Sequence, residues 1–144
     1  TTPGEALNYD HVEAEVSAVS DRFDVRALNY DPWGSKQLRS HLEDAGAPVW
    51  ECRQGFASLS PPSKELERLV AERLLRHGGH PVLRWNMAGT TVVEDPAGNI
   101  KPDRKRSRSR IDGVVALIMA LEAWLRDHRP GVSVYEERGI EVAR

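Results

Sequence analysis

Hydrophobic residues recur at helical spacing in two segments of the first third of the chain. In residues 9–22, Val12 and Val16 fall on one face with further apolar residues, and charged residues occupy the other, which predicts an amphipathic helix. A second helix is predicted over residues 35–45, and Gly46 follows it as a residue type that readily ends helices. Each segment therefore has one apolar face to bury.

Short runs outside these helices are predicted to be extended. Residues 25–30 are followed by an Asp-Pro pair that ends at Pro32, and proline disfavours the helical conformation at the residue before it, so a strand is predicted. Residues 48–53 form a second short strand of the same kind. Residues 90–100 are typical of strand, turn and strand, a hairpin with Gly98 in its bend.

The second half of the chain contains the longest helical patterns. The Ser-Pro-Pro-Ser run at residues 60–63 predicts the start of a third helix, because proline is tolerated in the first helical turn. Residues 81–89 are ambiguous between a loop and a short helix. The strongest apolar periodicity predicts a helix over residues 108–127. The tail, residues 132–144, is expected to add one short extended piece.

Strands that alternate with helices indicate an α/β domain with a partly parallel sheet. In such sheets, ligands gather beyond the carboxyl ends of the strands. Asp31 directly follows the first predicted strand, which places it at such an end. With 144 residues, the chain (residues 1–144) is expected to form a single domain.

Charge and cysteine content exclude several classes of protein. Lys and Arg total 20, Asp and Glu total 22, and the net charge is −2, so nucleic-acid binding must depend on where basic residues lie. A single cysteine excludes an internal disulfide and a cysteine-only zinc site, and it favours a reducing, cytosolic setting. No apolar run approaches the roughly 20 residues that span a bilayer, and the polar start lacks a signal peptide, so no membrane association is expected.

Two aspartates are the strongest candidates for chemistry. Asp31 lies at the end of a predicted strand, and Asp112 lies in the first turns of the last predicted helix. Each also has a simpler structural interpretation: Asp31 as the start of an Asx turn, and Asp112 as a favourable charge at a helix N-terminus. If both face one sheet edge, their carboxylates can bind Mg²⁺ or Mn²⁺, which prefer hard oxygen ligands. Two such ions support in-line displacement at phosphorus.

A dense basic run leads directly into Asp112. Its six cations are Lys101, Arg104, Lys105, Arg106, Arg108 and Arg110. One interpretation is a solvated, mobile loop. The other is a strip that contacts nucleic-acid phosphates, which would give salt-dependent affinity without sequence preference. The position next to Asp112 favours the second interpretation.

The remaining chemically distinctive residues are weaker signals. His77 and His80 lack a third zinc ligand and are more simply interpreted as loop hydrogen-bonding residues. Cys52 is expected to be a small buried residue. Four tryptophans are expected in the core or at its rim rather than as base-stacking platforms: Trp33, Trp50, Trp85 and Trp124. No nucleotide-binding glycine-rich loop is present, so the sequence contains no ATPase motif.

Several motifs follow one another along the chain in an order that points to a family. They are Tyr30-Asp-Pro-Trp33, Gln54-Gly55 with Leu59-Ser60-Pro61, Lys64-Glu65-Leu66-Glu67, residues 76–85, residues 98–102, residues 110–117 and a Tyr135-Glu-Glu-Arg138-Gly139 tail. In this order, they resemble the C-terminal part of the large terminase subunit of tailed bacteriophages. The resemblance covers nearly the whole chain.

The resemblance implies a fold and an activity. The family joins an N-terminal packaging ATPase to a C-terminal nuclease with a ribonuclease H-like fold, a mixed, mainly parallel sheet flanked by helices. That nuclease cuts concatemeric double-stranded DNA with divalent metals, Mg²⁺ or Mn²⁺, held by acidic residues. Asp31 matches the family's acid at the end of a central strand, and Asp112 matches the acid on the late helix. The family also implies a portal protein and a small terminase subunit as partners, in the host cytoplasm.

The chain departs from the family pattern in one respect. The family has a further aspartate on the first strand of its fold, upstream of the segment that matches here, so this domain is expected to be truncated at its N-terminal edge. Glu65, Glu67 and Asp95 are then weaker candidates to complete the acidic site, although Glu65 and Glu67 are more simply partners of a helix dipole. The missing strand also predicts an uncovered edge and self-association.

Two rival functions remain beside the nuclease. A module that contacts DNA, the portal or the small subunit without cutting is favoured by the missing acid. A nuclease of the Holliday-junction or transposase type is less favoured, because those families lack the motifs at residues 77–85 and 100–102.

Overall fold

The computed structural model describes residues 9–33 and 35–128. In that part of the chain the elements follow in the order α1 (Tyr9–Ser20), β1 (Leu28–Tyr30), α2 (Lys36–Asp44), β2 (Val49–Glu51), α3 (Phe56–Ala71), α4 (Pro81–Gly89), β3 (Val92–Glu94), β4 (Ile100–Pro102) and α5 (Asp112–Asp127). The predicted extended piece at residues 132–144 and the tail motif at residues 135–139 lie outside the described residues. None of the described helices is both long and apolar enough to cross a membrane.

The α/β class is confirmed, but the described strands do not form one mixed sheet. β1 and β2 pair in parallel, with Asn29 opposite Trp50, and α2 connects them. β3 and β4 form a separate antiparallel hairpin. The predicted hairpin is therefore present, with Gly98 in its turn at a φ of +77° that glycine adopts without strain.

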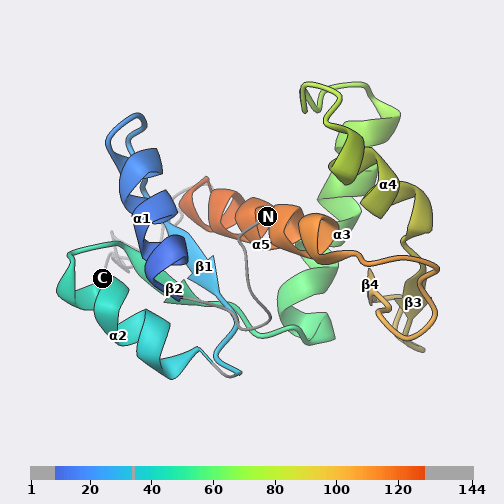
Figure 1. Ribbon diagram of the computed structural model, residues 1–144. Coiled ribbons are helices and arrows are strands. Elements are labelled where there is room, and N and C mark those ends of the chain that lie inside the picture. Colours follow the sequence, from blue (N-terminus) through green and yellow to red (C-terminus); the bar gives the residue numbers. More distant parts are fainter. Residues whose placement is uncertain (1–8, 34, 129–144) are drawn as a thin grey trace, which may run out of the picture.

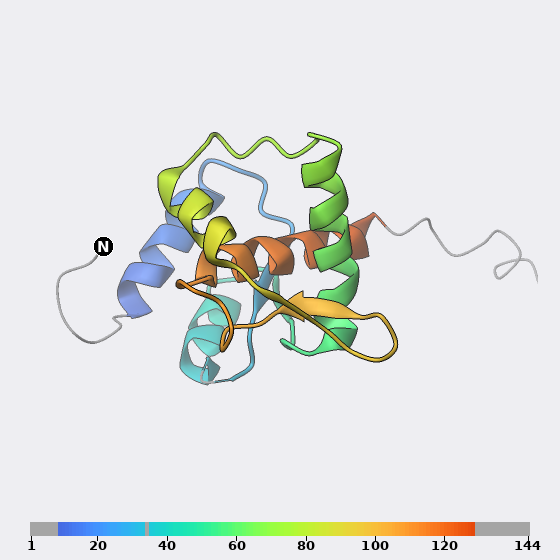
Figure 2. The same cartoon turned by 90° about the vertical axis from the view of Figure 1, so that its right-hand side faces the viewer.

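Helices α3 and α5 build the core and separate the two small sheets. In Figure 1, α5 crosses the centre of the molecule, with α1, α2, β1 and β2 on one side and α3, α4 and the hairpin on the other. Figure 2 shows the hairpin against α3. The buried apolar cluster consists of Cys52, Leu59, Leu66, Ile111, Val114, Val115, Ile118 and Met119. Because α5 supplies half of these side chains, it fixes the position of the elements that pack on it.

The start of α3 differs from the prediction. The helix begins at Phe56, so Pro61 and Pro62 lie inside it and not in its first turn. Each proline lacks an N–H and cannot bond the carbonyl four residues earlier, which normally destabilises a helix. Here Pro62 is almost completely buried in the protein interior, and its packing offsets part of that cost. The Ser-Pro-Pro-Ser signal therefore indicated a helix but placed its start several residues too late.

Two further boundaries and one predicted face differ as well. Residues 81–89 form a helix, which resolves their ambiguity, and α5 begins at Asp112 rather than at residue 108. Helix α1 has no buried residue, and its main packing partner among the described elements is α2. Phe23, which extends the apolar face predicted for residues 9–22, is 60% exposed.

Candidate functional site

Asp31 follows β1 and forms the turn that leads into α2. Its side chain is half-buried, and its Oδ1 accepts a hydrogen bond from the backbone N–H of Trp33 at 3.0 Å. The hydroxyl of Ser35 donates to the Asp31 backbone carbonyl. This is the Asx-type turn of the simpler interpretation. The hydrogen bond from Trp33 engages one carboxylate oxygen, Oδ1.

Asp112 is the first residue of α5, and its carboxylate faces the basic run. Its Oδ1 lies 3.2 Å from Nη2 of Arg104, with both side chains more than half exposed. A negative charge in the first turn is favoured by the helix dipole, so the simpler interpretation of Asp112 holds here too. The adjacent pocket has a volume of about 340 Å³ and is lined by Arg104 and residues 107–112. The structure thus brings the strip and Asp112 together.

Contacts along α5 show on which side of the helix Asp31 lies. Arg26 is 3.9 Å from Asp127 near the C-terminal end of α5, and Asn29 donates to the carbonyl of Met119 at 2.8 Å. The chain through β1 therefore runs opposite to α5, toward its N-terminal half. Continued past Tyr30, this course leads toward the half of α5 that begins with Asp112. That Asp31 and Asp112 bind a metal at one shared site stays a prediction.

The described residues provide carboxylates for a metal but no larger ligand group. In residues 9–33 and 35–128, no three or more His, Cys, Asp and Glu side chains are arranged to hold an ion. Two aspartates supply the hard oxygen ligands that Mg²⁺ accepts, and Mg²⁺ usually takes only one or two carboxylates, with waters and substrate phosphates in its other positions. The donor chemistry of Asp31 and Asp112 therefore fits such an ion.

The weaker acidic candidates are engaged in local structure. Glu65 pairs with Arg68 at 2.7 Å, and this hydrogen bond lowers the pKa of its carboxyl. Asp95 closes the β3–β4 turn by accepting hydrogen bonds from Ala97 and Asn99, and the bonds from Asn99 lower its pKa most. Glu67 is exposed on α3. These contacts favour structural roles for Glu65 and Asp95.

The basic strip is a folded loop held by Asp103. The Asp103 carboxylate accepts hydrogen bonds from the backbone of Lys105 and Arg106, and its backbone carbonyl accepts one from the Ser107 hydroxyl. Lys101, in β4, donates to the Gln54 carbonyl at 3.0 Å. The other five cations of the strip are exposed: Arg104, Lys105, Arg106, Arg108 and Arg110. The loop therefore presents five charged groups on one ordered segment.

The C-terminal end of α4 supports this loop, a role that the sequence did not reveal. Asn86 is 4% exposed, and its Oδ1 accepts a hydrogen bond from the backbone N–H of Gly113 at 2.8 Å. A Cβ on Gly113 would lie 2.7 Å from that oxygen, and a Cβ on Gly89 would lie 1.8 Å from the Ser109 hydroxyl oxygen. Both glycines are therefore needed where α4 meets the start of α5. The only signal in the sequence was the pair of glycines.

A second polar cluster, at the other end of α5, was also missed. Asn29 donates to the Glu122 carboxylate at 2.6 Å and accepts from Arg126 at 3.1 Å. Arg126 also pairs with Glu122 at 2.7 Å and lies 4.8 Å from the centre of the Trp50 ring. We refer to Asn29, Glu122 and Arg126 as the Asn29 network. It joins β1 to α5 across more than ninety positions of sequence.

The remaining sequence-based expectations have mixed outcomes. His77 and His80 each accept a backbone hydrogen bond two residues on, as the loop interpretation expects. Cys52 is 2% exposed, and burial, with a smaller contribution from Glu122, raises the pKa of its thiol to about 11. The tryptophans were expected in the core or at its rim, and the buried cluster of the described residues contains none of them. Trp50, Trp85 and Trp124 are about half exposed, whereas Trp33 is 91% exposed.

Comparison with known proteins gives consistent matches. The sequence profile of the family described as terminase large subunit, endonuclease domain, matches residues 2–128. The chain is 37% identical over 125 residues to the terminase large subunit of Enterobacteria phage HK97, covering 85% of this chain and 25% of that protein. It is 31% identical over 126 residues to protein YmfN of Escherichia coli K12, covering 83% of this chain and 27% of YmfN.

A solved structure resembles the fold as well. The crystal structure of the HK97 bacteriophage large terminase superposes with a TM-score of 0.78 at 36% identity, covering 85% of this chain and 26% of that one. The chain thus spans about a quarter of the length of these relatives.

Proposed function

This chain belongs to the terminase large-subunit endonuclease family, and we propose that it acts as the nuclease domain of a large terminase subunit, cutting concatemeric double-stranded DNA during phage DNA packaging. The observation that carries the proposal is the ion pair between Arg104 and Asp112, which joins the basic strip to the candidate acid. A DNA backbone held on the strip would pass directly over Asp112. The proposed setting is the host cytoplasm, with the portal protein and a small terminase subunit as partners.

Each element of the site has a distinct role in this proposal. Asp31 and Asp112 would hold Mg²⁺ or Mn²⁺, which, when bound, polarises the scissile phosphate and favours attack by water. Arg104 neutralises Asp112 in the absence of DNA, and its exposed guanidinium can turn to a phosphate oxygen when DNA arrives. Lys105, Arg106, Arg108 and Arg110 contact neighbouring phosphates without reading bases. Lys101 is held by the Gln54 carbonyl and fixes the start of the strip.

The proposal is tested by a cutting assay on supercoiled plasmid with the large subunit in Mn²⁺. We expect relaxed and linear products that disappear when a chelator is added. Asp31→Asn should lower the cutting rate by at least about 100-fold, since removal of one group that stabilises charge in a transition state commonly costs that much. Asp127→Asn, at the other end of α5, is the matched control and should cut normally. Cutting that persists with chelator, or that Asp31→Asn leaves intact, would refute the metal mechanism.

The second candidate is a module that binds DNA or packaging proteins without cutting. It is favoured by the lack of a three-ligand metal group among residues 9–33 and 35–128. In the same assay, plasmid that is shifted on a gel but never relaxed at any Mn²⁺ concentration would support this candidate over the nuclease.

A further inference from the structure

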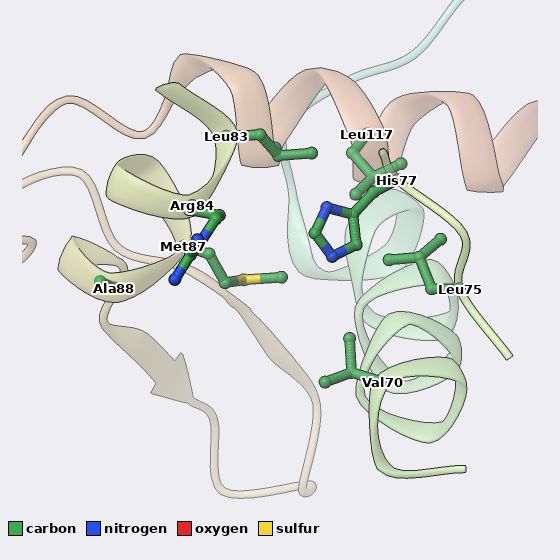
Figure 3. Close-up of a pocket in the computed structure, with 8 residues that line it drawn as sticks. All are labelled: Val70, Leu75, His77, Leu83, Arg84, Met87, Ala88 and Leu117. Carbon is green, nitrogen blue, oxygen red and sulfur yellow. The ribbon is translucent and has the colours of Figure 1, made fainter. Parts of the chain in front are cut away.

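A pocket of about 380 Å³ lies between the end of α3, helix α4 and the middle of α5, away from the basic strip. It is lined by Val70, Leu75, His77, Leu83, Arg84, Met87, Ala88 and Leu117. Figure 3 shows the Met87 side chain reaching from α4 toward His77, with Val70 and Leu75 on the facing side. Most of the lining is aliphatic, and the volume falls within the range of ligand pockets.

The surface around this pocket exposes unusually large apolar side chains. Val70, in the pocket wall, is 49% exposed, and Leu74 is 58% exposed on the chain just before the lining residue Leu75. Single exposed apolar residues are ordinary, but a group beside an open apolar pocket is typical of an interaction site.

The segment that supplies six of the eight lining residues is basic. Residues 73–93 contain three arginines and two histidines, and no aspartate or glutamate. The acid just before them, Glu72, is paired with Arg68 at 2.5 Å. Among the described residues, no carboxylate pairs with Arg84 at the pocket wall, and the His77 ring is bonded only to the backbone of Gly79. A cation therefore stands at the edge of an apolar cavity with no anion opposite it.

We propose that this pocket binds a protein segment that presents a bulky apolar side chain next to a carboxylate. The apolar side chain fills the space between Val70, Met87 and Leu117, and the carboxylate pairs with Arg84. A nucleic acid matches the charge but not the cavity, since it offers phosphates and base edges and no bulky aliphatic side chain to bury. The proposal does not depend on the nuclease function, because none of its residues belongs to the strip or to the acid pair.

Its chemistry is tested with two probes of equal size and opposite charge, 4-phenylbutyrate and 4-phenylbutylamine. NMR spectra of the 144-residue chain should show saturable shifts of the Met87 methyl and neighbouring signals with the carboxylate. The amine should bind about fivefold more weakly, the most that an exposed ion pair normally contributes. Arg84→Gln should abolish this preference, and the matched control Arg110→Gln should keep it. Equal binding of both probes, or no shift at Met87, would overturn the proposal.

The nature of the occupant is tested with a labelled peptide in which Glu and Leu residues alternate. It should bind and displace 4-phenylbutyrate, whereas the same peptide with serine in place of leucine should not. Ala88→Trp narrows the pocket and should weaken peptide binding. Leu83→Ala changes the pocket wall, should weaken peptide binding as well, and is used if Ala88→Trp fails to fold. A DNA duplex that displaces the probe while the peptide does not, or concentration-dependent shifts of the free chain alone, would assign the surface to DNA or to a second copy and refute the proposal.

Discussion

The two ends of α5 each carry a carboxylate with an arginine partner, but the two pairs are built differently. At the C-terminal end, Glu122 and Arg126 lie 2.7 Å apart with side chains only 20% and 29% exposed, and Asn29 bonds both. At the N-terminal end, Asp112 and Arg104 lie 3.2 Å apart with side chains 62% and 56% exposed. The first pair is enclosed by its own hydrogen bonds, whereas the second remains open to a ligand.

This difference separates a structural acid from a candidate catalytic acid on one helix. A partly buried carboxylate that bonds two side chains cannot change partners without leaving other polar groups unpaired. An exposed pair contributes little to stability and can exchange partners at low cost. Substitutions at the N-terminal end of α5 are therefore expected to affect cutting, whereas substitutions at the C-terminal end are expected to affect stability.

The largest expected difference is in cutting by the large subunit in Mn²⁺. Asp112→Asn should lower the rate by at least about 100-fold, because the candidate metal ligand loses its charge. Glu122→Gln, the matched removal of charge at the other end, should change the rate by less than about threefold in the folded protein, since Glu122 contacts neither the strip nor Asp31. Initial rates on linear duplex DNA measure both. Equal losses of cutting rate in the two variants would contradict the assignment of the catalytic role to the N-terminal end of α5.

The next effect concerns the two asparagines that hold the ends of α5. Asn29→Ala and Asn86→Ala should each lower the free energy of unfolding by about 1–3 kcal/mol, because each leaves a partly buried polar partner without its hydrogen bond. Urea denaturation of the chain measures this loss. Only Asn86→Ala should also reduce cutting under conditions where the protein is folded, since Asn86 fixes Gly113 beside Asp112. Reduced cutting by Asn29→Ala to the same extent would contradict the comparison.

These asparagines also show where sequence reasoning reached its limit. Local patterns predicted the strand before Asp31, the hairpin around Gly98 and the acid in the first turn of α5, because each depends on neighbouring residues. The Asn29 network and the contact of Asn86 with Gly113 join positions 27 to 97 apart, which no periodicity encodes. The helix start before Pro61 was mispredicted for the same reason, since packing of α3 against α5 overrode local preference.

A smaller effect is expected in DNA binding by the strip. Replacing both Arg108 and Arg110 by glutamine should weaken binding equally for unrelated duplexes. The dependence of log affinity on log salt should fall by about 0.9 for each phosphate that the double variant no longer neutralises. Arg26→Gln, an exposed arginine near the other end of α5, is the control and should leave the slope unchanged. Fluorescence anisotropy over a range of salt concentrations measures the slope, and an unchanged slope in the double variant would exclude the strip from DNA contact.

The smallest predicted effect uses Cys52 as a probe of the enclosed end. Its thiol should react slowly with a disulfide reagent at pH 8, because it is buried and its pKa is raised to about 11. Glu122→Gln should speed the reaction severalfold, since loss of that negative charge lowers the pKa of the thiol and loosens the Asn29 network. Asp112→Asn should leave the rate unchanged. If Asp112→Asn sped the thiol reaction more than Glu122→Gln, the N-terminal end of α5 would be the more tightly held.

The central claim is that Asp31 and Asp112 share one metal site next to the basic strip, and a crystal of the large subunit soaked in Mn²⁺ tests it most directly. The account predicts an anomalous peak with oxygens of both carboxylates roughly 2.0–2.6 Å away, and Arg104 displaced from Asp112. A peak bound by other residues, or the two carboxylates directed to opposite sides of α5, would contradict it.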